Sequence, residues 1–322
     1  MTGSMSAPTP LSATLASPPA ALAAAEEALL ATAGVAVERC EAPGPGGARL
    51  HYLTCGEGEP LLLLHGRGGA AAGFTPILAP LAAQRRVIAL DLPGWGLSDK
   101  PPFSGRTAQD ALRVWMDGAL ALLDHLGLEQ VDLLGHSMGG FTALGLALEH
   151  PERVRSLLLT DSGGLGREVA FDVRLFFWLM PERLYPRLGR GFLARMLAMD
   201  SPGHPGRAVP RDAAFEFAWQ VGTQRDVIPS GGRAFNAWVD LLGVHLDLLD
   251  RLRTLQPPTL LLWGERDHVT PYAHALHARK FIRQGRLVAF TGCGHSPFAE
   301  RPEDFARVVN VWLNGGNAPS RV

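Results

Sequence analysis

The chain has 322 residues, of which 47% are hydrophobic and 19% charged, an ordinary globular composition with enough apolar material for a sizeable core. Its formal net charge of −1 provides no basic surface for phosphates, so nucleic acid is not expected as a partner. No apolar run approaches the roughly 20 residues that span a bilayer, and no basic residue precedes Arg39 to begin a secretory signal, so we expect a cytoplasmic protein without a membrane segment.

The N-terminal segment, residues 1–34, is rich in Ala, Pro, Ser and Thr and is predicted to be a flexible tail with a short helix near Pro19–Thr32. Two strands follow at Val35–Cys40 and Arg49–Cys55, joined by a Gly/Pro turn. Short apolar runs bounded by Gly, Pro or charge then indicate strands buried on both faces of a parallel sheet. These runs are Leu61–Leu64, Val87–Leu90, Val131–Leu134, Val154–Thr160, Thr259–Trp263 and the weaker Arg286–Phe290.

Helical patterns lie between the predicted strands. Thr107–Leu128 opens with Thr107 and Asp110 at the spacing of a capping box, and its apolar residues recur at helical intervals. Further helices are predicted at Phe141–His150 and Pro302–Leu313. Alternation of strand and helix is typical of a doubly wound α/β fold.

One long segment interrupts this alternation. Residues 163–253 contain no buried-strand run and show only helical patterns, at 173–180, 188–199 and 235–249. The segment is too long for a loop, so it is predicted to be a mostly helical insertion. The α/β core then comprises residues 35–162 and 254–322.

The strongest chemical signal is Gly135-x-Ser137-x-Gly139, which stands between a predicted buried strand and a predicted helix. The pattern alone occurs by chance, but a strand–turn–helix context is that of a nucleophile elbow, whose two glycines relieve crowding around the serine. The serine oxygen would then lie at a helix N-terminus, which favours negative charge. We predict Ser137 as the nucleophile of a serine hydrolase.

A serine hydroxyl needs a base to take its proton. In this arrangement an acid and then a histidine follow the serine, each after a later strand. Asp267 ends one predicted strand and His295 follows the next, so they are predicted as the orienting acid and the general base. Glu265, and Asp161 at the end of another strand, stay open as alternative acids.

The developing oxyanion needs backbone N–H donors. The predicted donors are Met138, directly after the nucleophile, and Arg67 in the loop His65–Gly69, with Gly68 as the alternative to Arg67. This glycine loop matches neither a dinucleotide site nor a P-loop. His65 and His136 lie beside the site and are interpreted mainly as holding its turns.

The substrate is expected to be a small hydrophobic molecule. The candidate substrate-binding residues are Gly66, Gly68, His136, Trp95 and Trp219. The aromatic cluster Phe176–Met180 is a further candidate, although helix packing is its favoured interpretation.

No cofactor and no metal are expected. The three cysteines, Cys40, Cys55 and Cys293, are too few and too scattered for a disulfide framework or a Cys-rich zinc site, and they suit a reducing compartment. His274 and His277 are spaced for one helix face, but nothing else supports a metal there.

Taken together, these motifs show that the chain resembles the α/β-hydrolase superfamily from Val35 to Leu313. The resemblance implies an eight-stranded, mostly parallel sheet flanked by helices, with a helical cap that corresponds to residues 163–253. It is carried by His65-Gly66, Asp91-x-Pro-Gly-x-Gly96, Gly135–Gly139, Trp263-Gly-x-x-Asp267 and Gly294-His295.

Within that superfamily, Ser137 argues against epoxide hydrolases and haloalkane dehalogenases, which resemble this chain but carry aspartate at the nucleophile position. Carbon–carbon hydrolases of aromatic ring cleavage share the triad, but their glycine loop normally contains a Gly-Pro step and a Trp usually follows the histidine. This chain has Gly68-Gly69-Ala70 and Ser296 at those positions. Capped carboxylesterases and lipases therefore fit with fewest exceptions.

The leading hypothesis is a carboxylic-ester hydrolase that acts through an acyl-enzyme on Ser137. The alternatives are a carbon–carbon bond hydrolase of a ring-cleavage diketone, a cofactor-free perhydrolase, and a non-catalytic ligand sensor on the same scaffold. Fold alone does not choose among them, because many activities share this scaffold.

Overall fold

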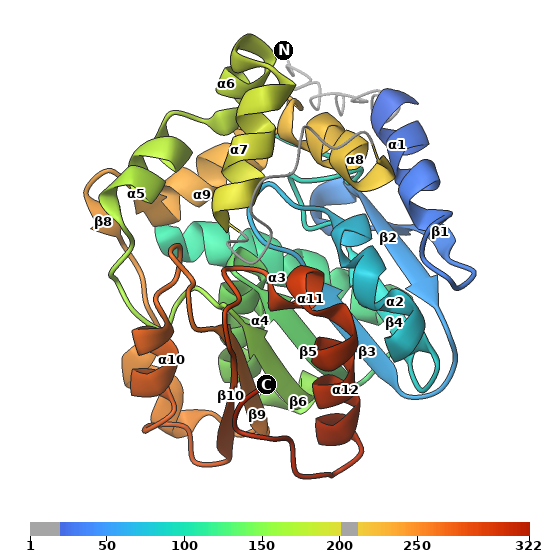
Figure 1. Cartoon of the computed structure of the whole chain (residues 1–322), viewed down its shortest axis with the longest axis vertical. Coiled ribbons are helices and arrows are strands. Elements are labelled where there is room, and N and C mark those ends of the chain that lie inside the picture. The colour runs from blue at the N-terminus through green and yellow to red at the C-terminus, as the bar shows by residue number, and fades with distance from the viewer. Residues whose placement is uncertain (1–19, 201–211) are drawn as a thin grey trace, which may run out of the picture.

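The computed structural model describes residues 20–200 and 212–322 (Figure 1). In these residues an eight-stranded sheet has the order β1-β2-β4-β3-β5-β6-β9-β10. The pairs β1–β2 and β2–β4 are antiparallel and the others are parallel, so the mostly parallel α/β-hydrolase sheet is confirmed. The strands are β1 (Glu38–Pro43), β2 (Arg49–Cys55), β3 (Pro60–Leu64), β4 (Arg86–Leu90), β5 (Val131–His136), β6 (Val154–Thr160), β9 (Thr259–Gly264) and β10 (Gly285–Phe290).

The first strand begins later than its sequence suggested. The sequence predicts this strand over Val35–Cys40, whereas β1 covers Glu38–Pro43. Its antiparallel register with β2 runs from Glu38 opposite Thr54 to Pro43 opposite Arg49, across the short 3₁₀ turn Pro45–Gly47. Only Ala42 of β1 is buried, so the strand has little apolar alternation to mark where it begins, and the turn fixes its register with β2.

Two hydrophobic clusters cover the two faces of the sheet, because successive strand residues point to opposite sides. Leu62 and Leu64 of β3 belong to the cluster with α3, α4 and α10, whereas Leu61 and Leu63 belong to the cluster with α1, α2 and α12. The core helices are α1 (Ala20–Leu30), α2 (Thr75–Ala82), α3 (Ala108–His125), α4 (Met138–Glu149), α10 (Tyr272–Ala278), α11 (Pro297–Glu300) and α12 (Pro302–Leu313). None of the described helices is both long and apolar enough to cross a bilayer.

The predicted capping box at the start of α3 is present. The Thr107 hydroxyl accepts a hydrogen bond from the Asp110 backbone N–H at 3.1 Å, and the Asp110 carboxylate accepts one from the Thr107 N–H at 3.0 Å. Each side chain satisfies a backbone donor that the first helical turn leaves without a partner.

The helix predicted near Pro19–Thr32 is α1, which packs against helix α8 (Ala213–Gly222) of the insertion as well as against the core. Its fully buried Glu26 accepts hydrogen bonds from Arg39 Nε at 2.8 Å and pairs with His51 Nε2 at 3.1 Å. The predicted flexible tail at residues 1–19 lies outside the described residues.

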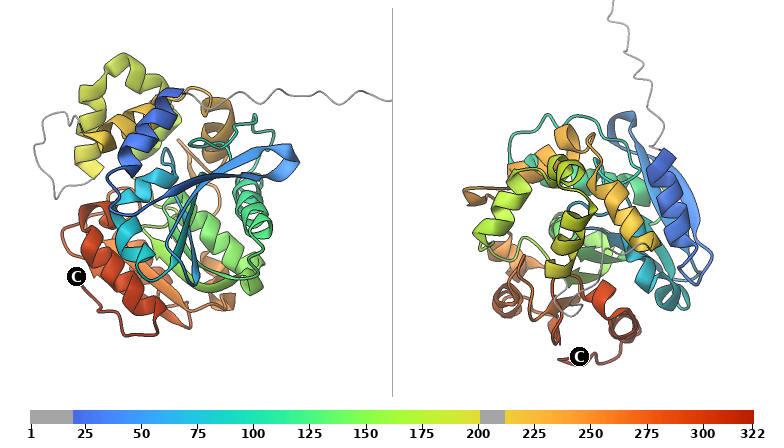
Figure 2. Two further views of the ribbon diagram at one scale, coloured as in Figure 1. Left: turned by 90° about the vertical axis from the view of Figure 1, so that its right-hand side faces the viewer. Right: turned by 45° about the horizontal axis from the view of Figure 1, so that its top comes forward.

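The described residues between β6 and β9 add no strand to the main sheet and lie at one end of it, at the top of Figure 1. We call its described residues, 163–200 and 212–253, the insertion; its outer boundaries stay a prediction. Figure 2 shows the same helices gathered over that end from two other directions. Besides α8, it contains α5 (Phe171–Trp178), α6 (Pro181–Leu188), α7 (Arg190–Asp200), the π-helical turn η4 (Ile228–Gly232), α9 (Arg233–Trp238), β7 (Val239–Asp240) and β8 (Gly243–Val244).

The prediction of a helix over residues 235–249 is wrong beyond Trp238, where α9 ends. A short hairpin of β7 and β8 follows instead. The Asp240 carboxylate accepts hydrogen bonds from the backbone N–H groups of Leu242 at 2.7 Å and Gly243 at 3.3 Å, and Gly243 adopts a positive φ of 139°. This aspartate turn competes with helix propagation, although the apolar spacing of the segment resembles a helix.

Candidate active site

Ser137 lies in the tight turn between β5 and α4. Its φ of 54° and ψ of −115° are a conformation that a residue with a side chain rarely adopts. The Ser137 N–H donates to the Thr160 carbonyl at 3.1 Å, and its own carbonyl accepts from Phe141 at 3.1 Å and Gly163 at 2.9 Å. These bonds on both sides of the residue hold the unusual backbone in place.

The two glycines of the elbow are required by close backbone contacts. A Cβ on Gly135 would lie 2.3 Å from the Gly139 carbonyl oxygen, and one on Gly139 would lie 2.1 Å from the Leu64 carbonyl oxygen. Both distances are far below van der Waals contact. Only glycine therefore lets β5, α4 and the end of β3 approach this closely around Ser137.

Asp267 and His295 are brought together by the loops after β9 and β10. Asp267 Oδ2 lies 2.8 Å from His295 Nδ1 and accepts the Thr270 hydroxyl at 2.6 Å, and Oδ1 accepts the N–H groups of Val269 at 2.7 Å and Thr270 at 2.9 Å. Burial by itself would raise the pKa of Asp267, but attraction to His295 and these hydrogen bonds outweigh it and lower that pKa. Asp267 is thus an ionised acceptor that orients the imidazole of His295.

The alternative acids have other partners. Glu265 forms an ion pair with Arg321. Asp161 is fully buried next to Asp267, and burial followed by the charge of Asp267 raises its pKa well above the usual range. Its carboxyl oxygens receive the Gly264 N–H and the Thr160 hydroxyl, each at 2.9 Å, so a protonated Asp161 supports the loop that carries Asp267.

His136 connects the elbow to the histidine loop. Its Nε2–H donates to the backbone carbonyl of His295 at 2.8 Å, and the two rings lie 4.8 Å apart. Burial, followed by the neighbouring His295, lowers the pKa of His136 to about 3, so the ring is neutral at physiological pH. His136 therefore positions His295 rather than exchanging protons.

The loop after β3 runs directly against the elbow. A Cβ on Gly66 would lie 2.9 Å from His136 Nδ1 and 3.0 Å from Ser137 Cβ, so this loop has no room for a side chain there. Among the described residues, the N–H groups of Arg67 and of Met138, the first residue of α4, donate to no backbone carbonyl. Both predicted oxyanion donors thus have N–H groups without a backbone partner near Ser137. The N–H of Gly68, the alternative donor, likewise donates to no backbone carbonyl of the described residues, and Gly68 has a positive φ of 66°.

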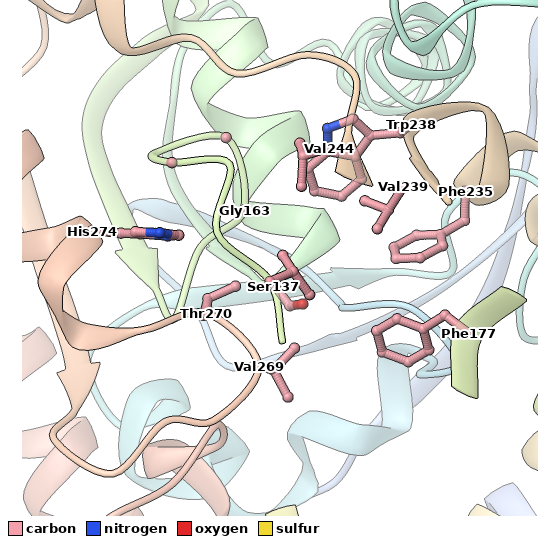
Figure 3. A pocket seen from close by; sticks show the side chains of 13 residues that line it. Ser137, Gly163, Phe177, Phe235, Trp238, Val239, Val244, Val269, Thr270 and His274 are labelled. Carbon is pink, nitrogen blue, oxygen red and sulfur yellow. The ribbon is translucent and has the colours of Figure 1, made fainter. Parts of the chain in front are cut away.

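A pocket opens at Ser137 between the core and the insertion (Figure 3). In Figure 3, Phe177 and Phe235 lie on one side of Ser137 and His274 on the other. His274 Nε2 pairs with Glu168 at 2.9 Å. The lining residues are Ser137, Gly163, Gly164, Gly166, Val169, Phe177, Phe235, Trp238, Val239, Val244, Val269, Thr270 and His274.

The predicted substrate-binding residues are not among those that line the pocket, although Gly66 and His136 lie directly beside Ser137. None of Gly66, Gly68, His136, Trp95 and Trp219 lines this pocket. Trp95 is 1% exposed beneath the insertion, and Trp219 packs in the cluster of Tyr185, Leu193 and Phe215.

The residues that do line the pocket come largely from the insertion, with Val269 and Thr270 from the loop after β9 and His274 from α10. The sequence identified Phe177 only as part of an aromatic cluster, and it gave no local sign that Phe235, Trp238 and His274 converge on Ser137. Their convergence depends on how the insertion folds back over the core.

Two groups of described residues could each supply three ligand atoms within 4.8 Å of one another. One is Asp161, Asp267 and His295, whose atoms are engaged in the hydrogen bonds above. The other is Glu26, His51 and Asp91; the Asp91 carboxylate already accepts the N–H groups of Ala71 and Leu97, both at 2.6 Å. Protein partners thus occupy both groups, and neither points to a metal site.

The chain is similar to several proteins named as hydrolases or esterases. It is 32% identical to the 2-hydroxymuconate semialdehyde hydrolase of Pseudomonas sp. (strain CF600) over 84% of this chain and 93% of that protein. It is 31% identical to the 2-hydroxy-6-oxo-6-phenylhexa-2,4-dienoate hydrolase of Comamonas testosteroni, over 82% and 91% respectively. The structure of a thermophilic esterase from Thermogutta terrifontis matches with a TM-score of 0.69 and 26% identity, covering 86% of this chain and 98% of that one.

A family model described as the alpha/beta hydrolase fold matches residues 59–302, which include the elbow, both loops and the whole insertion. The match covers well over half of the chain and agrees with the observed sheet order. The chain is therefore a hydrolase that belongs to the α/β-hydrolase fold family, related to the carbon–carbon bond hydrolases.

Proposed function

We propose that this hydrolase cleaves a carbon–carbon bond in a ring-cleavage diketone, a 2-hydroxy-6-oxo-dienoate or a close analogue. The observation that carries the proposal is the similarity, over more than four fifths of the chain, to two relatives named for such substrates. The motifs of the chain by themselves favour ester hydrolysis, whereas these relatives favour the alternative, carbon–carbon bond cleavage.

In the first step of the proposed mechanism, the Ser137 hydroxyl attacks the ketone carbon next to the bond to be broken. His295 takes the hydroxyl proton, and the ionised Asp267 stabilises the imidazolium that forms. The ketone oxygen becomes an oxyanion that receives the N–H groups of Arg67 and Met138.

In the second step, the carbonyl re-forms and the carbon–carbon bond breaks. Cleavage requires the diketo form of the substrate, in which the 2-hydroxyl group has become a carbonyl and its proton has moved to the carbon next to the ketone. The departing carbon can then carry the electron pair, because it is conjugated through the remaining C=C bond with this second carbonyl, and His295 returns its proton to the leaving fragment. Water, activated by His295, then hydrolyses the acyl group on Ser137 and releases a carboxylic acid.

The departures from the ring-cleavage pattern do not remove any group that this mechanism uses. The oxyanion donors are backbone N–H groups, so Gly68-Gly69-Ala70 in place of a Gly-Pro step retains the Arg67 donor. Ser296, in place of the usual Trp, is the residue before α11 and is not among the pocket residues.

Ester hydrolysis is the second candidate. It is supported by the likeness to the thermophilic esterase and by the apolar side of the pocket, formed by Phe177, Phe235 and Trp238, which suits a hydrophobic acyl or alcohol group. The same nucleophile, base and donors serve both reactions, so only the leaving group distinguishes them.

A substrate panel tests the proposal. We expect loss of the yellow absorbance of a 2-hydroxy-6-oxo-dienoate with a kcat/KM above that of any short p-nitrophenyl ester. Ser137→Ala should reduce turnover by about 10⁴–10⁶-fold without changing Tm, because it removes only the nucleophilic oxygen.

Faster turnover of esters than of the diketone would replace the proposal by its second candidate. Binding of either ligand without turnover would contradict both and leave the sensor hypothesis.

A further inference from the structure

A buried ion pair joins the oxyanion loop to the insertion. Arg67 and Glu182 of α6 are 115 residues apart in the chain, and their Nη1–Oε1 and Nη2–Oε2 distances are 3.0 and 3.1 Å. Only 4% of the Arg67 side chain and 3% of the Glu182 side chain are exposed. The two parallel contacts fix the plane of the guanidinium as well as its position.

Aromatic rings restrain the same guanidinium from the core and from the insertion. Arg67 Cζ lies 5.6 Å from the ring centre of Trp95, 5.0 Å from that of Phe177 and 5.4 Å from that of Phe235. Trp95 follows β4 in the core, whereas Phe177 and Phe235 belong to α5 and α9. Together with α6, which carries Glu182, these two helices make three helices of the insertion that contact the Arg67 side chain.

Stability alone does not explain such a pair. Removing two charges from water costs about as much as their attraction returns, and apolar residues of similar size often stabilise a protein equally well. The pair is also imperfect, since Arg67 Nε is buried without a hydrogen-bond partner. A role in orienting the Arg67 side chain explains this buried ion pair better than stability does.

We propose that Arg67 and Glu182 are positioning residues through which the insertion sets the oxyanion donor. The proposal rests on the function proposed above. Glu182 and the aromatic rings fix the Arg67 side chain, and this fixes the direction of its own backbone N–H, the donor beside Ser137. The turn around Arg67 is closed by the Gly69 N–H, which donates to the Gly66 carbonyl at 3.1 Å. Gly68 in that turn has a positive φ and no neighbour within 4 Å of where its Cβ would be, so the Arg67 side chain is what ties this turn to the insertion.

The same contacts connect the donor to substrate binding. Phe177 and Phe235 touch Arg67 and also line the pocket at Ser137. A substrate that fills the pocket therefore packs against the residues that hold Arg67. Seating of the substrate against these rings and alignment of the oxyanion donor are then coupled, so a correctly seated substrate is favoured.

Direct binding of a substrate carboxylate by Arg67 is the competing explanation. It is disfavoured because both Nη atoms already face Glu182 and because Arg67 is not among the pocket residues. The two explanations predict different substrate dependence.

The test compares Arg67→Met, Glu182→Leu and the double variant with wild type, using Arg183→Met on the exposed side of α6 as the control. Glu182→Leu leaves a buried charge unpaired, so we expect a lower Tm, and the double variant should regain much of it. In all three variants we expect kcat to be about 10²-fold below that of wild type, because the loss of one oxyanion donor has an effect of this size. KM should change little, and the control should match wild type.

A ligand that forms the oxyanion gives a second readout. An aryl trifluoromethyl ketone adds to Ser137 and places an oxyanion at the donors, so its affinity should fall by the same factor as kcat. Recovery of kcat together with Tm in the double variant would show that the pair is merely structural. A loss confined to carboxylate substrates, with neutral esters unaffected, would assign Arg67 to substrate binding and overturn the proposal.

The proposed function and the proposed positioning role of Arg67 and Glu182 can be disproved independently of each other. If wild type turns over neither the diketone nor the esters, the proposed function is lost. The ketone affinities of the variants, followed by ¹⁹F NMR, still decide whether the pair positions the donor.

Discussion

Two buried carboxyl groups, Asp161 and Asp267, lie side by side at the end of the sheet, and their surroundings favour opposite protonation states. Asp267 faces His295 and receives three hydrogen bonds from Val269 and Thr270, which favour the carboxylate. Asp161 is buried and forms no ion pair in the part of the chain that the structure describes; burial raises its pKa, and the charge of Asp267 raises it further. Like charges this close cannot both ionise, so the partner of the histidine takes the charge.

Matched substitutions test this assignment. Asp267→Asn should lower kcat by about 10⁴-fold, because an amide cannot stabilise the imidazolium and favours the wrong tautomer of His295. Asp161→Asn should lower kcat by less than about 10-fold, since a neutral group of the same shape replaces a neutral acid. Both variants are measured for kcat and Tm. A larger loss in Asp161→Asn than in Asp267→Asn would reverse the roles of the two acids.

At the scale of elements, α1 is attached to the core through a buried polar cluster as well as through apolar packing. Glu26 of α1 lies between Arg39 of β1 and His51 of β2. Burial by itself would lower the pKa of His51, but the hydrogen bond to Glu26 and the charge of Asp91 outweigh it and raise that pKa above 6.5. Protonated His51 is therefore favoured in the folded chain.

This shift predicts how stability depends on pH. A raised pKa in the folded state contributes stability that is fully present below the unfolded value of about 6.5 and is lost as pH rises through the folded value. We expect the Tm difference between wild type and His51→Gln to be larger at roughly pH 5.5 than at roughly pH 9.

Two further variants complete that experiment. Glu26→Ala should cost about 1–3 kcal/mol near neutral pH, because it leaves buried donors unpaired. The exposed His125→Gln serves as the control and should show no such trend. A Tm difference for His51→Gln that is constant or grows with pH would contradict the assignment.

At the scale of the whole molecule, Trp238 joins the insertion to the core and borders the pocket. Its ring stacks on Phe141 of α4 at 4.1 Å and meets Trp115 of α3 edge-on at 6.5 Å. The backbone at Gly163 lies so close that a Cβ there would be 2.2 Å from the indole. Trp238 thus packs against two core helices and the pocket wall at the same time.

Replacing this residue should change stability and specificity together. Trp238→Ala should lower the free energy of unfolding by about 3–5 kcal/mol and raise kcat/KM for bulkier substrates relative to small ones. Trp219→Ala, in the separate cluster around Tyr185, should lower stability without changing that ratio. Denaturant unfolding and a series of substrates of increasing size provide the measurements. Equal shifts of preference in both variants would place Trp219 at the pocket after all.

Much of the fold could be predicted because its signals are local. A strand buried on both faces is apolar throughout, and all eight predicted strands appear, with only the first displaced. The crowded elbow demands glycine at 135 and 139 whatever the rest of the molecule does. The β7–β8 hairpin could not be predicted in this way, because the turn that the Asp240 side chain stabilises overrides an apolar spacing typical of a helix.

The sequence by itself determined the sheet, the strained position of Ser137 and the order in which Asp267 and His295 follow it, because period, glycine placement and strand ends are properties of neighbouring residues. Only the tertiary structure decided which carboxyl group holds His295 and which side chains meet at the pocket. It alone brought Glu182 to Arg67 across 115 residues. Those contacts depend on how the insertion packs on the core, and packing between distant segments leaves no periodic trace in the chain.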